Sequence, residues 1–217
     1  MTNFAASREA MVDCQIRPAD VTRYPIIEAM LSVPREQYLP NELRAVAYAG
    51  EHVALGNGRV LPEPRLFAKM LEAIDIQPGE LVLDIGAGTG YSLAVIGHIA
   101  EAVVGVESDA EMAAAAEATL SEQSVDNAVV HTGPLEDGAP DHGPYDVIFF
   151  EGGVEQIPQS LAAQLKQGGR AVAVFMDGPI GVCRTGIRTG AGLTWKREFE
   201  AAVPVLPGFE KTPEFVF

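Results

Sequence analysis

The chain of 217 residues has only two cysteines, Cys14 and Cys183, and they lie far apart in the sequence. Such scarce and distant cysteines predict neither a disulfide framework nor a zinc site. The four histidines show no metal-ligand spacing, and none lies in a cluster with cysteine. We therefore expect no metal centre.

Positive charge is also scarce, because 15 Lys and Arg residues stand against 30 Asp and Glu residues, a net charge of −15. This charge repels phosphate backbones and anionic lipid, so we expect no nucleic-acid partner and no membrane association. No apolar run approaches membrane-spanning length. The polar residues 1–11 lack the apolar stretch of a signal peptide. We expect a cytoplasmic protein that is monomeric or a weak homo-oligomer.

What the chain does have is an apolar content of 47%, enough for one α/β domain with a sizeable core. The first part is expected to be helical, from apolar residues at helical spacing. The predicted helices cover residues 3–17, 21–33, 41–48 and 65–74, with a short strand at 53–55. Residues 56–64 contain two glycines and two prolines, which predicts a shaped loop.

Beyond residue 80, apolar runs alternate with helical segments. Strands are predicted at 81–85, 102–106, 127–131, 145–150 and 169–176, and helices at 91–99, 109–122 and 157–166, the last ending at Gly168 and Gly169. The strands are continuous apolar runs, as expected for a parallel sheet buried on both faces. Residues 181–188 and 193–200, joined by 189–192, predict an antiparallel hairpin.

The most informative stretch is residues 81–90, Leu-Val-Leu-Asp-Ile-Gly-Ala-Gly-Thr-Gly, where an apolar strand runs into a glycine loop. Glycines in such a loop let a ligand lie directly against the backbone. A dinucleotide fingerprint would place its third glycine where this chain has Tyr91, so the spacing argues against a dinucleotide. Asp84, near the end of the strand, suits a ligand with a positively charged amino group.

A second acid, Glu107, ends the next apolar run, roughly 20 residues past the loop, where an acid typically accepts hydrogen bonds from ribose hydroxyls. The strand at 145–150 leads into a third acid, Glu151. Ligands of such sheets bind beyond the carboxyl ends of the strands, so Asp84, Glu107 and Glu151 are expected to line one crevice. The alternative is a tight strand-to-helix turn with an ordinary surface glutamate.

These motifs make the chain resemble class I S-adenosylmethionine-dependent methyltransferases. Within that class it is similar, from about Met30 onward, to the protein-L-isoaspartate O-methyltransferase family. The segments that carry this resemblance are residues 33–38, 48–64, 78–91, 145–148, 157–158 and 165–169. The Val-Pro-Arg-Glu segment at 33–36, followed by the loop at this spacing, makes the resemblance specific.

The resemblance implies a doubly wound, mostly parallel seven-stranded sheet, a Rossmann-like methyltransferase fold, with an N-terminal helical cap and a C-terminal antiparallel hairpin. It implies one domain over 1–217: cap and substrate loop at 1–75, cofactor core at 76–180, and hairpin and tail at 181–217. The implied cofactor is S-adenosylmethionine. Its expected binding positions are Asp84, Gly86, Ala87, Gly88, Gly90, Tyr91, Glu107, Ser108, Leu135 and Glu151.

Three places depart from the family's pattern. In the active-site loop, Gly-x-x-Thr-Ile-Ser-x-Pro in the family, Val60 replaces the threonine and Pro62 the serine, so both hydroxyls are absent. After the third strand, residues 133–134 are Gly-Pro where the family has Gly-Asp, whose acid reads the adenine amino group; backbone near Leu135 or a neighbour such as Glu136 is left to do this. After the fourth strand, Glu-Gly-Gly replaces Thr-Ala-Ala.

The chemistry tolerates the lost hydroxyls, because a carboxylate acceptor is already ionised and the sulfonium methyl is already activated. Holding the two in line can supply several kcal/mol, up to roughly 7–11 in favourable cases. We therefore assign the catalytic positions to Arg59, Val60 and Pro62. Arg59 is the expected substitute, since a guanidinium grips a carboxylate in a bidentate fork. The alternative is that Arg59 is a solvated loop side chain.

The favoured hypothesis is methyl transfer to the carboxylate of isoaspartyl residues, so the expected partner is a protein or peptide carboxylate. A second hypothesis is a cofactor-binding sensor or docking module without transfer activity. The absent hydroxyls favour it, and so does Glu151, which would repel an anionic substrate. A third is a methyltransferase with another small acceptor. A nicotinamide-dependent reductase ranks last because of Tyr91.

Overall fold

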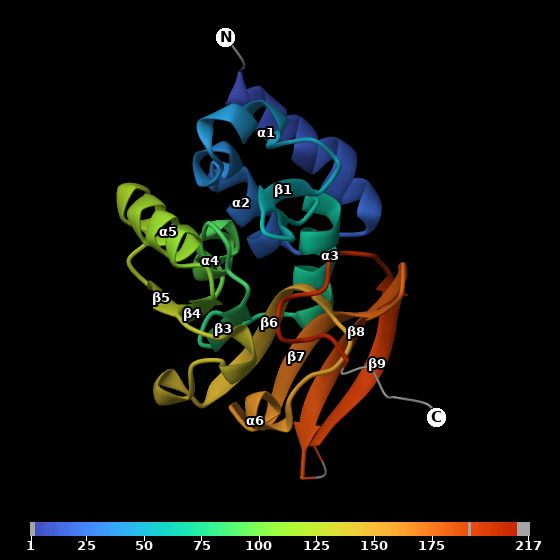
Figure 1. The fold of residues 1–217 in the computed structure, drawn as a ribbon. Helices are drawn as coiled ribbons and strands as arrows, with labels where there is room; N and C mark the ends of the chain where they lie inside the picture. Colours follow the sequence, from blue (N-terminus) through green and yellow to red (C-terminus); the bar gives the residue numbers. More distant parts are fainter. Residues whose placement is uncertain (1–2, 191, 212–217) are drawn as a thin grey trace.

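The computed structural model describes residues 3–190 and 192–211, and a seven-stranded sheet forms its centre (Figure 1). The strands lie in the order β5-β4-β3-β6-β7-β8-β9. They are β3 (Leu81–Ile85), β4 (Ala102–Glu107), β5 (Ala128–Thr132), β6 (Tyr145–Val154), β7 (Leu165–Asp177), β8 (Ile180–Thr189) and β9 (Gly192–Glu200). The first five in this order are parallel, and β8 and β9 are antiparallel. The predicted fold is confirmed.

The strand order reverses direction at β3, because β4 and β5 lie on one side of it and β6 and β7 on the other. Ligands of parallel sheets bind where the order switches, since the loops that leave the two neighbouring strands part there. Asp84 of β3 lies opposite Phe149 of β6 in the register. The segments that follow β3, β4 and β6 therefore surround one place at the carboxyl edge of the sheet.

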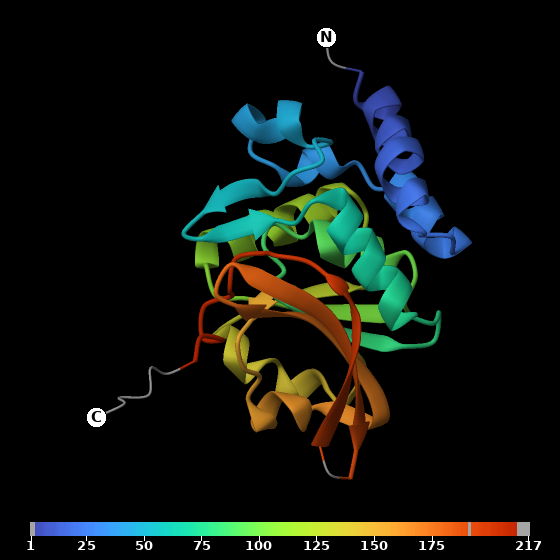
Figure 2. The same ribbon diagram turned by 90° about the vertical axis from the view of Figure 1, so that its right-hand side faces the viewer.

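Helices and a small hairpin cover this edge and the faces of the sheet. The α-helices are α1 (Phe4–Met11), α2 (Tyr24–Ser32), α3 (Pro64–Ile74), α4 (Tyr91–Gly97), α5 (Ala110–Glu122) and α6 (Gln159–Ala162). A π-helical turn covers Val12–Ile16, and 3-10 turns cover Arg17–Ala19, Arg35–Tyr38, Asn41–Val46, Leu135–Asp137 and Pro140–His142. Figure 2 shows the cap above the sheet and, beneath the cap, the hairpin β1 (Val53–Gly56) and β2 (Arg59–Leu61).

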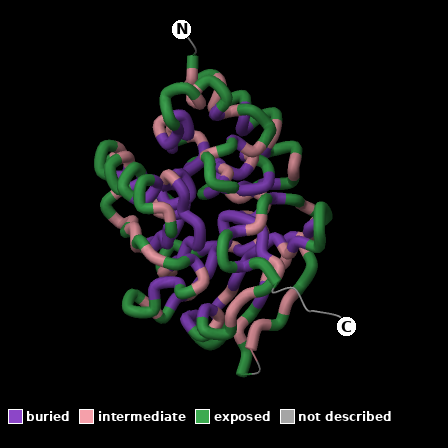
Figure 3. Tube along the Cα trace, in the orientation of Figure 1, coloured by how far each residue is buried: buried purple, intermediate pink, exposed green. Residues whose placement is uncertain are grey.

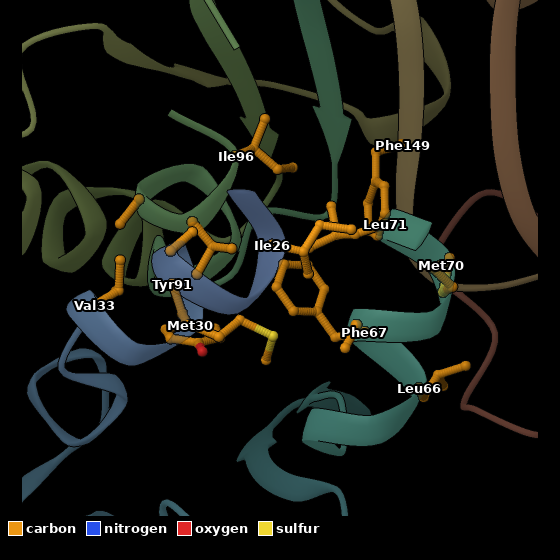
Figure 4. Packing of buried hydrophobic residues seen from close by; sticks show 14 of the residues in the cluster. Ile26, Met30, Val33, Leu66, Phe67, Met70, Leu71, Tyr91, Ile96 and Phe149 are labelled. Carbon is orange, nitrogen blue, oxygen red and sulfur yellow. The ribbon is translucent and has the colours of Figure 1, made fainter. Parts of the chain in front are cut away.

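Two apolar clusters hold these layers together. Figure 3 shows that the buried residues gather toward the middle of the molecule, with exposed residues along its outside. On one face, Phe67 of α3 contacts both Tyr91 of α4 and Phe149 of β6 with tilted or edge-on rings (Figure 4). On the other face, Phe150 of β6 packs edge-on against Phe209 of the C-terminal segment. Truncating a buried aromatic such as Phe67 to alanine costs about 3–5 kcal/mol, so the cap is firmly joined to the sheet.

Two local predictions about residues 157–169 are wrong. The expected helix at 157–166 ends at Ala162, and β7 already begins at Leu165. Gly168 and Gly169 do not end a helix but lie within β7, where the register against β6 jumps from Leu165–Tyr145 to Arg170–Val147. Gly168 has a φ of +77°, which suits glycine. The glycines thus form a strand irregularity, which local sequence cannot distinguish from a helix end.

The front of the chain also differs in detail. The expected helix at 41–48 is a 3-10 segment over Asn41–Val46, and the expected loop at 56–64 contains the strand β2. In the expected hairpin turn, residue 191 lies outside the described residues, as do residues 212–217 of the tail. In the part of the chain that the structure describes, none of the helices combines the length and the apolar character needed to cross a membrane.

Candidate active site at the carboxyl ends of the central strands

Two carboxyl groups meet at one hydroxyl where β3 and β6 part. Ser92 Oγ, in the first turn of α4, lies 2.5 Å from Asp84 Oδ2 and 2.5 Å from Glu151 Oε2. Asp84 and Ser92 are fully buried, and Glu151 is 4% exposed. The second oxygen of Asp84, Oδ1, is buried and has no hydrogen-bond partner among the described residues. The arrangement leaves one acidic oxygen available to a cationic group.

Burial dominates the ionisation of this pair. It raises the pKa of Asp84 to about 7, against the hydrogen bond from Ser92 and the charge of Arg59, which lower it. Burial also raises the pKa of Glu151 well above its ordinary value, and the nearby Asp84 charge raises it further. Two neighbouring buried acids whose pKa values are both raised are typical of a functional site.

The glycine loop follows directly and is tied to the third acid. Gly86 and Gly88 have φ values of +86° and +53°, which a residue with a Cβ adopts only at a cost. The Gly88 N–H donates to Glu107 Oε2 over 2.8 Å, and the Asp109 N–H donates to Glu107 Oε1 over 3.0 Å. Glu107 is fully buried at the end of β4. The three predicted acids, Asp84, Glu107 and Glu151, therefore do line one place.

Arg59 of the β1–β2 hairpin lies on this loop and is only 4% exposed. Its Nη1 donates to Glu107 Oε1 and its Nη2 donates to the Gly86 carbonyl, each over 2.8 Å. The hairpin has a second polar tie, from Asn57 Nδ2 to Asp109 Oδ2 at 3.0 Å. Arg59 is therefore not a solvated loop side chain, and its fork grips the expected ribose acid and a loop carbonyl.

Arg35, from the Val-Pro-Arg-Glu segment, anchors the same loop from the cap side. Its Nη2 donates to the Pro62 carbonyl over 2.6 Å, and its Nε donates to the Ala47 carbonyl over 2.7 Å. The guanidinium carbon lies 4.7 Å from the centre of the Tyr91 ring. Arg35 is fully buried, and this burial lowers its pKa. Arg35 therefore holds two backbone carbonyls, one of which belongs to the loop expected to carry the active site.

The remaining predicted positions fall into different surroundings. Tyr91 is buried against Tyr38 and Phe67, so its side chain belongs to the core between cap and sheet. Val60 is half-buried in β2, while Pro62 is buried just beyond that strand. The other four are Ala87, Gly90 and Leu135, which are buried, and Ser108, which is exposed.

A groove of about 400 Å³ lies beside the ends of β4 and β5. It is lined by Ser108, Thr132, Gly133, Pro134, Leu135, Glu136, Pro207 and Gly208. Ser108, the residue after Glu107, and Leu135 thus line one groove. This is where the sequence places recognition of an adenine ring.

Three contributors were not predicted from the sequence as site residues: Ser92, Arg35 and Leu206. A Cβ built on Gly86 would lie 2.9 Å from Leu206 Cδ2, and one on Gly152 would lie 2.5 Å from it. The C-terminal segment therefore covers both the glycine loop and the end of β6. Arg35 had a signal, since it stands in the segment that makes the family resemblance specific, whereas Leu206 had none. Among residues 3–190 and 192–211, no three His, Cys, Asp or Glu side chains gather as they would around a metal ion.

Comparison with known proteins identifies the family of this chain. Residues 6–181 match the family described as Protein-L-isoaspartate(D-aspartate) O-methyltransferase (PCMT). The chain belongs to this family. It is 40% identical over 171 residues to Protein-L-isoaspartate O-methyltransferase 1 of Rhodopseudomonas palustris, covering 79% of this chain and 70% of that protein. It is 33% identical to the Roseiflexus castenholzii enzyme, over 98% of this chain and 97% of the relative.

Solved structures agree with the fold of this PCMT member. A protein-L-isoaspartate O-methyltransferase superimposes with a TM-score of 0.82 at 25% identity, covering 93% of this chain and 66% of its own. A Plasmodium falciparum protein in complex with S-adenosyl-L-homocysteine shares the fold with a TM-score of 0.77 at 17% identity, covering 95% of this chain and 99% of its own. Members of the family take their methyl group from S-adenosylmethionine, and this chain is an S-adenosylmethionine-dependent O-methyltransferase.

Proposed function

We propose that this PCMT member methylates the free carboxylate of isoaspartyl residues in damaged protein. The relatives named above carry this activity in their names. The observation that supports the proposal is the contact of Arg59 with Glu107 and Gly86, because it joins the hairpin expected to bind the substrate to the loop expected to bind the cofactor. A methyl acceptor bound at the hairpin then lies next to the methyl donor.

The side chains present fit S-adenosylmethionine, which supplies an activated methyl on a sulfonium when bound. Asp84 Oδ1, buried without a partner among the described residues, suits the ammonium of the methionine end. The positive φ values of Gly86 and Gly88 let that end lie against the backbone. Glu107 is the acid for the ribose hydroxyls, and its Oε1 is shared with Arg59, so Arg59 must share or leave that oxygen.

The protein's own contribution is to orient the acceptor and exclude water, since no proton has to be removed from an ionised carboxylate. Positioning of this kind supplies up to roughly 7–11 kcal/mol in favourable cases. Val60 and Pro62 offer no hydroxyl, so the loop acts through its backbone shape. Arg35 holds that shape at the Pro62 carbonyl, and Arg59 holds it at the Gly86 carbonyl.

The test is transfer of a tritiated methyl group from S-adenosylmethionine to an isoaspartyl peptide, with the matching aspartyl peptide as control. We expect transfer to the isoaspartyl peptide alone. Binding of S-adenosylhomocysteine is measured on the same preparation by calorimetry. Binding without transfer to either peptide would overturn the acceptor and point to a cofactor-binding module. Transfer to both peptides, or to a small acid or amine instead, would point to a different acceptor.

A further inference from the structure

In the cluster of Asp84, Ser92 and Glu151, one serine hydroxyl makes two short oxygen–oxygen contacts but carries only one hydrogen. Ser92 Oγ is 2.5 Å from an oxygen of each carboxyl group. A serine hydroxyl carries one hydrogen, so it donates to one of the two and must accept from the other. Two oxygens at this distance with no hydrogen between them would repel each other through their lone pairs. The second hydrogen can come only from a carboxyl group.

We propose that Glu151 keeps this hydrogen when Asp84 is ionised and acts as a neutral positioning residue, donating to Ser92 Oγ while Ser92 donates to Asp84. The assignment to Glu151 follows from the other oxygen of Asp84, which is buried without a partner among the described residues and suits a ligand ammonium only when Asp84 is ionised. Two ionised carboxylates in one buried site also repel each other, so one of them stays protonated.

The surrounding charges agree with this assignment. The charged or titratable groups that face the cluster are Arg59 of β2, Glu107 of β4, Tyr91 of α4 and Arg35 of the 3-10 turn. Arg59 lowers the pKa of both acids, yet its two nitrogens are engaged by Glu107 and the Gly86 carbonyl. Arg35 lowers the pKa of Glu151 but is held by the Ala47 and Pro62 carbonyls. Burial outweighs both cations at Glu151.

A neutral Glu151 has a consequence for the substrate, which rests on the proposed function. An ionised Glu151 beside the glycine loop would repel an isoaspartyl carboxylate and would put a second full charge beside Asp84. The protonated form removes both effects, so an acid at this position is compatible with an anionic acceptor. Where the family has the threonine of Thr-Ala-Ala, this chain then has a neutral hydrogen-bond donor, Glu151, rather than a charge.

The direct test is infrared difference spectroscopy of the cofactor-free protein at about pH 8, where Asp84, with its pKa of about 7, is ionised. The parent chain is compared with Glu151→Gln. We expect the substitution to remove a protonated-carboxyl C=O band. The matched control is Glu117→Gln on the exposed side of α5, which is expected to remove ionised-carboxylate bands instead. Loss of ionised bands in Glu151→Gln would overturn the proposal. Loss of the protonated band in Asp84→Asn, but not in Glu151→Gln, would move the hydrogen to Asp84 and also overturn it.

A second readout separates this role from simple packing. Glutamine mimics the protonated acid, so Glu151→Gln is expected to change S-adenosylhomocysteine affinity by less than about threefold, whereas Asp84→Asn loses about a hundredfold or more. The folded state holds the Glu151 proton more tightly than the unfolded chain does, so this stabilisation is lost as pH rises above the ordinary pKa of a glutamate, about 4.3. The Tm of Glu151→Gln should therefore gain on that of the parent as pH rises. A Tm difference that stays constant with pH would contradict the proposal. Neither readout depends on methyl transfer, so the proposal for Glu151 can fail or hold independently of the proposed acceptor.

Discussion

Arg59 Nη1 lies 2.8 Å from Glu107 Oε1, and the two side chains are 4% and 0% exposed. Forty-eight positions separate them in the chain, one on the substrate hairpin and the other at the end of β4. The pair joins the loop that is expected to hold the methyl acceptor to the acid that is expected to hold the cofactor ribose. Changes at either residue should therefore affect both stability and binding.

Replacing Glu107 by alanine is expected to do both. Removing one partner of a buried ion pair leaves the other uncompensated, so we expect a loss of about 3–5 kcal/mol in the free energy of unfolding, measured by urea denaturation. Affinity for S-adenosylhomocysteine should fall by about 1–3 kcal/mol from lost hydrogen bonds. The exposed Glu111→Ala on α5 is the control. A double variant with both Glu107→Ala and Arg59→Ala should lose less unfolding free energy than the sum of the two single losses. A loss equal to that sum would show that the pair is not coupled.

Asp84→Asn is expected to keep the fold but lose the cofactor. The ammonium of the ligand would lose its buried counter-charge, so the Kd for S-adenosylhomocysteine should rise by about two orders of magnitude or more. Calorimetry measures the Kd, and the exposed Asp126→Asn serves as the control. Unchanged affinity would show that the glycine loop is not the methionine end of the site.

Cofactor binding should depend on pH through Asp84. Its pKa in the folded protein is raised to about 7, so below pH 7 the carboxyl must release a proton before it can pair with an ammonium. The Kd for S-adenosylhomocysteine should rise about tenfold for each pH unit below 7 and level off above it. Measurements between pH 5.5 and 7.5 keep the amino group of the ligand in its protonated, ammonium form. A flat profile would mean that Asp84 is already ionised throughout.

The same shift has the opposite sign for the stability of the cofactor-free protein. The folded state holds the Asp84 proton more tightly than the unfolded chain does, so this stabilisation is present at low pH and is lost as pH rises from about 4 through about 7. We expect the Tm difference between the parent and Asp84→Asn to move in favour of the variant over this range. Thermal melts in one buffer series measure it, and parallel curves would contradict it.

Arg35→Lys should loosen the active-site loop. A lysine ammonium cannot reach the Ala47 and Pro62 carbonyls with the same planar fork, so we expect a loss of about 1–3 kcal/mol in unfolding free energy. Methyl transfer should fall further than cofactor affinity, because the substrate loop is what Arg35 holds. Arg17→Lys, at an exposed site, is the control. Equal effects at the two positions would rule out a role of Arg35 in shaping the loop.

Gly152→Ala tests the cover that the C-terminal segment forms over the site. The added Cβ would lie 2.5 Å from Leu206 Cδ2, and Leu206 is only 2% exposed. Overpacking of this kind costs about 1–3 kcal/mol. Gly79→Ala is the matched control, since nothing lies within 4 Å of its added Cβ. Pairing Gly152→Ala with Leu206→Ala should recover part of the loss, and no recovery would place the strain elsewhere.

Much of the fold was predictable because its signals are local. Strand β3 lies at the predicted residues, and the neighbouring strands agree within a few residues, since continuous apolar runs bounded by glycine mark buried parallel strands. The glycine loop predicted which edge of the sheet binds a ligand. Because ligands of parallel sheets bind beyond the carboxyl ends of the strands, Asp84, Glu107 and Glu151 were predicted to lie close together. The error at Gly168 and Gly169 arose because a strand irregularity and a helix end use glycine for the same conformational reason.

The sequence by itself determined the sheet, the loop and the identity of the three acids, because each depends on residues close together in the chain. Only the tertiary structure decided what those acids contact. Arg59 reaches Glu107 across 48 positions, and Ser92 joins Asp84 to a Glu151 that lies 59 positions beyond the serine. Periodicity carries no information about such pairs, because they form only when the hairpin and the strands pack. The same packing removes water from the carboxyl groups, and that desolvation sets their protonation.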